Sequence, residues 1–160
     1  MPLSRVRLIL DTNTLLRGIA RPESASGRLL DAVLERKMLL LTSRAVMDEY
    51  RTILLDKKIM ARYPHVSART IAGTLRAMTY LSDTVDAEAT RFGFPRDPKD
   101  EKFLTLAIAG RASHLITFDN DLLSLPTSHT DAAKRLRQRL PHLRIQMSGD
   151  FLAEHEAEFA

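Results

Sequence analysis

Two short apolar runs in this chain each end in an aspartate, and this pattern constrains the fold more than any other feature. Residues 6–10 lead into Asp11, and residues 114–118 lead into Asp119. Each run has the length and the apolar content of a buried strand. The carboxyl ends of parallel strands lie at one edge of a sheet, where ligands usually bind. The pattern therefore predicts that two acids meet at one edge of a parallel sheet.

Segments with helical periodicity separate these strands. Helices are expected over about 24–37, 44–55, 67–81, 100–112, 131–140 and 150–159. Further strands are expected over 38–42 and 143–147, with a short extended piece at Val85. Strands that alternate with helices are typical of a parallel sheet that is covered on both faces. We therefore expect a three-layer α/β/α sandwich with a central, mostly parallel sheet.

The size and composition of the chain limit its class. Its 160 residues fit a single domain over 1–160, with a core over about 6–125, an inserted basic helix at 127–141 and a final strand and helix at 143–159. The chain has no cysteine, which excludes disulfides, zinc fingers and cysteine nucleophiles. No apolar run is long enough for a secretory signal or a membrane span, so we expect a cytoplasmic protein.

Helical-wheel positions indicate which other acids could join the two strand ends. Asp100 lies on the centreline of the apolar stripe of the helix expected over 100–112, whereas Glu101 lies about a quarter-turn away. Glu49 lies at the border of the apolar face of the helix over 44–55. An inward carboxylate is costly unless it is paired, protonated or bound to a cation. The alternative for Asp100 is an ordinary acid that the helix dipole favours at a helix N-terminus.

Several carboxylates at one point favour a divalent cation. They repel one another and raise one another's pKa, and a hard cation such as Mg²⁺ or Mn²⁺ relieves this repulsion. Such ions also bind phosphate oxygens and activate water. The net charge of +4 and the pI of about 9.7 make the exterior basic. An acidic, cation-loaded pocket in a basic protein suits the cleavage of a phosphodiester.

Four segments, in this order, resemble the successive motifs of the PIN-domain family. They are Asp11-Thr12-Asn13, Glu49, residues 96–104 and residues 115–123. The branch that they resemble most is that of the toxin components of toxin–antitoxin systems, the virulence-associated protein C-like ribonucleases. The resemblance implies an α/β/α sandwich and a ribonuclease that depends on Mg²⁺ or Mn²⁺. It also implies homodimers and a cognate antitoxin protein that blocks the site.

The resemblance also assigns roles to individual positions. The catalytic acids and metal ligands would be Asp11, Glu49, Asp100 and Asp119. Asn13 and Thr117 match the polar positions beside the first and last acids, and we expect them to orient those carboxylates. Asp121 would be an additional outer ligand. The family pattern leaves a choice between Asp100 and Glu101, and the helical wheel favours Asp100.

Several basic residues are candidates for contacts with RNA phosphates. Arg17, Arg21 and Arg28 lie near the outlet of the first strand in sequence, and the helix over 131–140 carries Lys134, Arg135, Arg137 and Arg139. For that helix the favoured alternative is a solvated face with Leu136 and Leu140 packed inward, because charge runs are usually surface.

The function expected from these patterns is metal-dependent endonucleolytic cleavage of RNA by the toxin of a toxin–antitoxin pair. The products would carry 5′-phosphate and 3′-hydroxyl ends. The alternative enzyme is a DNA or flap nuclease of related fold, which substrate preference would separate. The non-enzymatic alternative is an inert nucleic-acid-binding module, whose binding would survive chelation. A receiver-like phosphoacceptor is disfavoured because no paired acid lies next to Asp11.

Overall fold

The computed structural model describes residues 1–160 and has a five-stranded sheet at its centre. All neighbouring strands are parallel, in the order β3-β2-β1-β4-β5. The strands are β1 Arg7–Leu10, β2 Leu39–Thr42, β3 Asp83–Thr84, β4 His114–Ile116 and β5 Arg144–Gln146. Each lies within or next to a segment expected to be extended, so the parallel sheet is confirmed.

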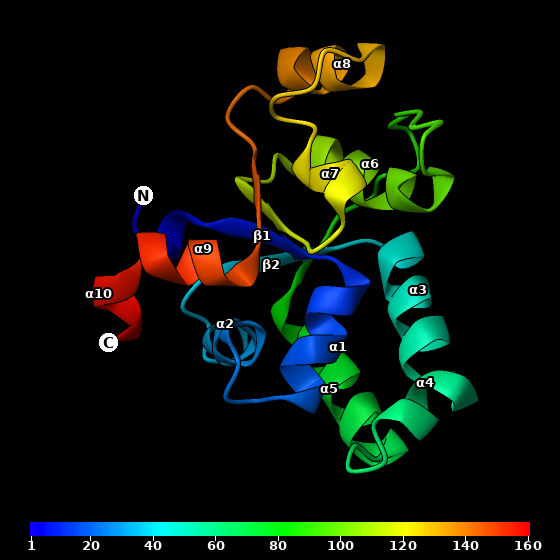
Figure 1. Ribbon diagram of the computed structural model, residues 1–160, viewed down its shortest axis with the longest axis vertical. Helices are drawn as coiled ribbons and strands as arrows, with labels where there is room; N and C mark the ends of the chain where they lie inside the picture. Colours follow the sequence, from blue (N-terminus) through cyan, green and yellow to red (C-terminus); the bar gives the residue numbers. More distant parts are fainter.

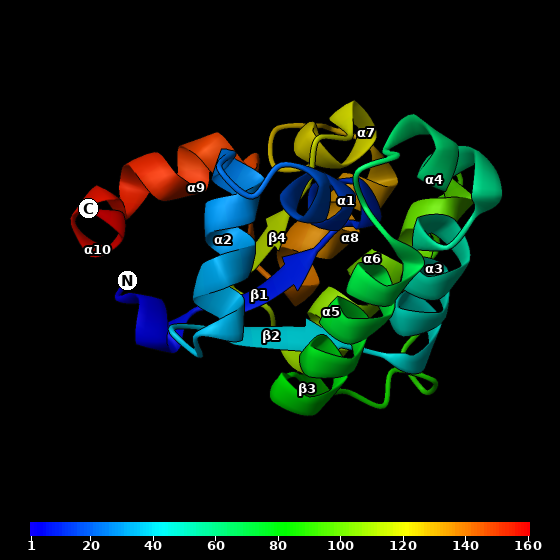
Figure 2. The same ribbon diagram turned by 90° about the horizontal axis from the view of Figure 1, so that it is seen from below.

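Helices cover both faces of this sheet. In Figure 1, α6, α7 and α8 lie on one side of the strands and α1, α2 and α5 on the other. Figure 2 shows α2 and α5 in front of β1 and β2. The helices are α1 Thr12–Ala20, α2 Ala25–Leu34, α3 Arg44–Leu54, α4 Lys57–Arg62, α5 Ala68–Leu81, α6 Glu101–Gly110, α7 Asn120–Leu123, α8 Asp131–Arg139, α9 Ser148–Glu154 and α10 Glu156–Phe159, with 3₁₀ turns η1 Leu3–Arg5 and η2 Pro98–Asp100. The expected three-layer α/β/α architecture is confirmed.

The register of the central strands brings the two acidic strand ends together. Leu10 of β1 pairs with Ile116 of β4, and the backbone N–H of Asp11 donates to the Ile116 carbonyl at 3.0 Å. The strand side chains Leu8, Ile9 and Leu115 are fully buried. Apolar side chains that are buried on both faces are typical of a parallel strand between two helical layers. The packed core therefore fixes the positions of the residues that follow β1 and β4.

Several helical segments differ from the sequence-based expectation, and α4 and α7 lie where no helix is expected. Helix α1 is absent from that expectation, which treats Asp11 only as a strand end. The expected helix over 150–159 is wrong: α9 and α10 are separated at His155, whose backbone leaves the helical region with φ −119°. The helix that begins after Ser24 ends at Leu34, and Arg36 adopts the left-handed conformation with φ 61°. None of the helices is long and apolar enough to cross a membrane.

Candidate metal centre

Asp11 directly follows β1 and Asp119 lies three residues after β4, and each caps the helix that follows it. One carboxylate oxygen of Asp11 accepts the backbone N–H of Asn13 at 2.8 Å, and one oxygen of Asp119 accepts that of Asp121 at 2.8 Å. Such bonds satisfy backbone donors that a helix N-terminus leaves free. The same local turn at two neighbouring strands therefore fixes the orientation of both carboxylates.

The Thr117 hydroxyl links these two acids. It donates to the second carboxylate oxygen of Asp11 and accepts the backbone N–H of Asp119 at 3.0 Å. Thr117 has no exposed surface. Thr117 thus contacts Asp11 through its side chain, whereas Asn13 does so through its backbone and exposes its side chain.

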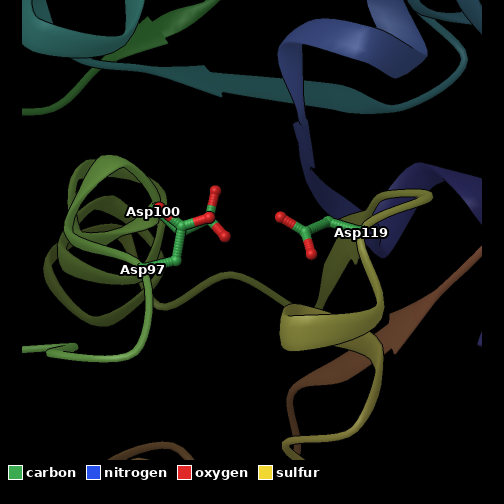
Figure 3. A group of neighbouring side chains, drawn as sticks. All are labelled: Asp97, Asp100 and Asp119. Atoms are coloured by element: carbon green, nitrogen blue, oxygen red, sulfur yellow. The ribbon is translucent and has the colours of Figure 1, made fainter.

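A third aspartate arrives from the 3₁₀ turn η2. Asp97 is the N-cap of η2 and Asp100 is its last residue, so the two acids lie one turn apart. Figure 3 shows these two carboxylates facing that of Asp119. Oxygen atoms of Asp97, Asp100 and Asp119 all lie within 4.8 Å of one another. We call these three residues the aspartate cluster.

Asp97 lies outside the sequence-based prediction, because the glycine and prolines of its segment indicate only a loop. A signal is nevertheless present in the sequence: Asp97 and Asp100 are three residues apart and Pro98 lies between them. Asp97 caps the turn by accepting the backbone N–H of Lys99 at 3.1 Å. Proline at the first position of such a turn is favourable because its missing N–H would have no partner there.

Asp100 is the buried member of the aspartate cluster. Its side chain is 8% exposed, and its Oδ2 atom has no hydrogen-bond partner. Burial, then the hydrogen-bonding contact with Asp119 and the charges of Asp119, Asp97 and Asp11, raise the pKa of Asp100 to about 8. The neighbouring Glu101 accepts the backbone N–H of Phe94 at 2.9 Å instead. The structure therefore turns Asp100, and not Glu101, toward the other acids.

Asp11 lies beside the cluster and responds to the same charges. Burial raises the pKa of Asp11, the hydrogen bonds from Thr117 and Asn13 lower it, and the charges of Asp119 and Glu49 raise it again. Because both oxygens of Asp11 already accept hydrogen bonds, its carboxylate is held in one orientation.

Glu49 lies near Asp11 but is paired with other groups. The Thr12 hydroxyl donates to one of its oxygens, and Lys102 Nζ lies 2.7 Å from the other. Tyr50, the next residue in α3, donates its hydroxyl hydrogen to the Leu10 carbonyl at the end of β1. Burial raises the pKa of Tyr50, so this donor stays protonated. Tyr50 therefore fixes α3 against β1 and sets the position of Glu49.

Asp121 forms an ion pair between two segments of the site. Its carboxylate lies 2.7 Å from Arg96 Nε, which joins α7 to the segment just before η2. Both side chains are partly exposed, so this ion pair contributes at most about 1 kcal/mol. The pair connects the segment that carries Asp97 and Asp100 to α7, the helix that Asp119 caps.

Two arginines of α8 donate hydrogen bonds to backbone carbonyls of other segments of the chain. Arg137 Nη1 donates to the carbonyls of Leu125 at 2.9 Å and Ser128 at 2.8 Å, and Arg135 Nη2 donates to the Gly93 carbonyl at 3.1 Å. These bonds hold the segments on either side of α8. Lys134 is exposed. On α1, the Arg17 guanidinium lies 4.1 Å from the centre of the Phe118 ring.

The cluster meets the requirements of a hard divalent cation. Its donors are carboxylate oxygens, which Mg²⁺ and Mn²⁺ prefer, and a buried oxygen of Asp100 lacks any partner. A cation between the carboxylates would supply that partner and cancel the repulsion that raises the pKa of Asp100. The residues present therefore fit a divalent metal ion.

Comparison with known proteins places the chain in a family. Residues 7–121 match the family model of the PIN domain, and the chain belongs to that family. The chain is 29% identical over 152 residues to the uncharacterized protein MJ1680 of Methanocaldococcus jannaschii, which covers 95% of this chain and 93% of that protein. No solved structure matches the chain significantly. PIN domains are generally metal-dependent nucleases, and the aspartate cluster is an acidic group of the kind that can hold a divalent ion.

Proposed function

We propose that this protein is an endoribonuclease that depends on Mg²⁺ or Mn²⁺. The observation that carries the proposal is the buried Asp100 carboxyl, which faces two further aspartates and keeps one oxygen without a partner. The bound ion would supply a Lewis acid for the scissile phosphate and a water of lowered pKa. Asp100 and Asp119 would hold that ion, and Asp97 would share this task.

The other predicted site residues would position these ligands. Asp11 lies beside the cluster, and Thr117 fixes its carboxylate. Glu49 would act through water, because its own oxygens are bound by Lys102 and Thr12. Lys102 in turn brings a positive charge toward the acids, where a substrate phosphate would approach. Asp121 orients Asp119 through its backbone N–H.

RNA is proposed as the substrate because of the resemblance of the motifs and the basic character of the chain. The net charge is +4, so an anionic polymer is attracted despite the acids at the site. Attack by water with departure of the 3′ oxygen gives 5′-phosphate and 3′-hydroxyl ends. As part of the same proposal, the protein is a cytoplasmic toxin that forms homodimers and is inhibited by a cognate antitoxin.

A cleavage assay on pooled RNA tests the activity. We expect cutting with Mg²⁺ or Mn²⁺, none with chelator, and a large loss for Asp11→Asn and Asp100→Asn. The matched control is Asp48→Asn, because Asp48 is an exposed acid one residue from Glu49 in α3. An Asp11→Asn protein that cuts as fast as the parent contradicts the proposal. Preferential cleavage of branched DNA would favour the DNA nuclease, and binding without cleavage at any metal concentration would favour the inert module.

Expression in cells tests the toxin role separately. We expect the parent protein to arrest growth and the Asp100→Asn protein to leave growth unchanged. Normal growth with active, soluble parent protein would contradict the toxin role and leave the nuclease proposal intact.

A further inference from the structure

A pocket of about 500 Å³ opens beyond the carboxyl end of β4. Phe118, which lines it, directly precedes Asp119 in the chain. The other walls come from the second half of α1, the start of α2, the residue after α4, and Met147 with the first turn of α9. A pocket of this size matches the lower part of the range usual for small-molecule sites.

The lining of this pocket combines flat and apolar groups with positive charge. The Arg17 guanidinium lies over the Phe118 ring at 4.1 Å, and Tyr63 and Met147 also line the pocket. Met147 is a large apolar side chain that stays 40% exposed. Unstacked RNA bases bind to such surfaces by stacking on aromatic rings and on arginine planes. Arg21 also lines the pocket, and neither Arg17 nor Arg21 forms a salt bridge.

A larger hollow of about 740 Å³ between α3 and α6 has the opposite charge balance. Four carboxylates and two cations line it: Asp48, Asp86, Glu88, Glu101, Arg44 and Lys102. Excess negative charge repels a phosphodiester backbone, so this hollow is the poorer path for RNA. In the smaller pocket the cations Arg17 and Arg21 outnumber the single carboxylate of Asp150.

The position of the pocket relates it to the proposed reaction. Arg17 lies six residues after Asp11, the N-cap of α1, which corresponds to roughly 9 Å along a helix. Phe118 and Asp119 are consecutive. A group stacked on the Arg17–Phe118 pair would thus lie close to a phosphate held at the cluster.

We propose that this pocket binds one nucleobase of single-stranded RNA, from a nucleotide next to the scissile phosphate, and that Arg17 is the residue on which the base stacks. The inference rests on the proposed function. Single-stranded RNA is required because a base in a duplex is already stacked and paired. The pocket would fix the register of the substrate, so cleavage would depend on the base at one particular position.

Fluorescence of 2-aminopurine tests this pocket directly. The chain has no tryptophan, so the signal of this base analogue is easily separated from that of the protein. Short single-stranded RNAs carrying 2-aminopurine at successive positions are titrated with the full chain in chelator, which reports binding without hydrolysis. We expect quenching by stacking at one position and loss of that quenching in Arg17→Ala, with affinity lower by roughly tenfold.

Two further variants separate stacking from charge. Arg36→Ala is the matched control, because Arg36 also lies over an aromatic ring, that of Tyr80 at 5.8 Å, but does not line the pocket. It removes the same charge and should keep the quenching. Arg17→Lys keeps the charge and loses the planar guanidinium, so it should lose the quenching while preserving the salt dependence of binding.

The outcomes distinguish this inference from the proposed function. Equal effects of Arg17→Ala and Arg36→Ala, or the absence of position-dependent quenching, would overturn the base pocket. Cleavage of RNA with such a result would leave the nuclease proposal standing. Conversely, quenching that depends on Arg17, without cleavage in Mg²⁺ or Mn²⁺, would support the pocket and contradict the nuclease proposal.

Discussion

The two ends of β4 both lie near buried titratable side chains, and their pKa values are shifted in opposite directions. Beyond its carboxyl end, Asp119 faces Asp100, whose pKa is raised to about 8. At its amino end, the pKa of His114 is lowered to about 4, mainly by burial and then by the charges of His155 and Arg144. Burial is the first cause at both ends, and it favours the neutral form of each group.

The two ends differ in how the neutral group is accommodated. His114 Nδ1 lies within hydrogen-bonding distance of Ser113 Oγ at 2.9 Å, and its ring packs edge-on against Phe151 with centroids 5.1 Å apart. Asp100 keeps a buried oxygen without any partner and faces two further acids. The protein itself therefore completes the packing around His114, whereas the surroundings of Asp100 are complementary to a cation. From this contrast we propose a structural role for His114 and a metal-binding role for Asp100.

Replacement of Asp100 by asparagine should give the largest effect. We expect RNA hydrolysis to fall by about a thousandfold or more, since a lost ligand removes several kcal/mol of transition-state stabilisation. Without metal, thermal unfolding should show no loss of stability, because the variant removes repulsion from Asp97 and Asp119. Asp48→Asn, at an exposed position, should match the parent in both measurements. Hydrolysis at the parental rate in the Asp100 variant would contradict the proposed metal-binding role of Asp100.

Metal affinity should depend strongly on pH. The metal requires the deprotonated Asp100 carboxyl, so affinity should rise about tenfold for each pH unit until the pH reaches about 8. The folded metal-free protein retains a proton that the unfolded chain releases above its ordinary pKa of 3.8. The stability of the metal-free protein should therefore fall as the pH rises from about 4 through about 8. Calorimetric titration with Mn²⁺ at several pH values measures the first effect, and a flat profile would contradict it.

The amino end of β4 should show the opposite pH dependence. The unfolded chain binds a proton at His114 near its ordinary pKa of 6.5, but the folded protein does so only near pH 4. The contribution of His114 to the free energy of unfolding is therefore complete above pH 6.5 and is lost as the pH falls through 4. At pH 5 the loss is about 2 kcal/mol. Denaturant unfolding of His114→Gln should lack this loss, whereas His142→Gln, at an exposed position, should retain it. Weaker metal binding by His114→Gln would show that the two ends are coupled.

Thr117→Val should have the smallest of these effects. The substitution removes the hydroxyl that orients Asp11 and accepts the Asp119 backbone N–H. Groups that orient metal ligands typically contribute tenfold or somewhat more, so we expect hydrolysis to fall by about tenfold. Thr79→Val is a matched control, because the Thr79 hydroxyl donates to the Leu75 carbonyl within α5. An equal loss in the two variants would assign the effect to stability alone.

The parts of the site that are predictable from the sequence follow from local rules. A buried strand followed by an aspartate delivers that carboxylate to the edge of a parallel sheet, and this rule alone predicts that Asp11 and Asp119 lie together. The helical wheel predicts that Asp100 points inward, because Asp100 falls on the same helical face as the apolar residues that follow it. These rules need only the spacing of nearby residues.

The remaining parts of the site depend on geometry or contacts that spacing does not encode. Asp97 joins the cluster because its segment forms a 3₁₀ turn and not a loop. Lys102 pairs with Glu49 across 53 positions of the chain, a contact that only the packed fold reveals. The arginines of α8 donate to backbone carbonyls in distant or irregular segments, and a charge pattern does not predict these hydrogen bonds.

Diffraction from crystals soaked in Mn²⁺ tests the central claim most directly, since anomalous scattering locates the ion without any assay. The account predicts a peak at the aspartate cluster, coordinated by Asp100 and Asp119, that disappears in Asp100→Asn crystals. A peak bound elsewhere, or none at saturating Mn²⁺, would contradict the assignment of this end of the sheet as a metal centre.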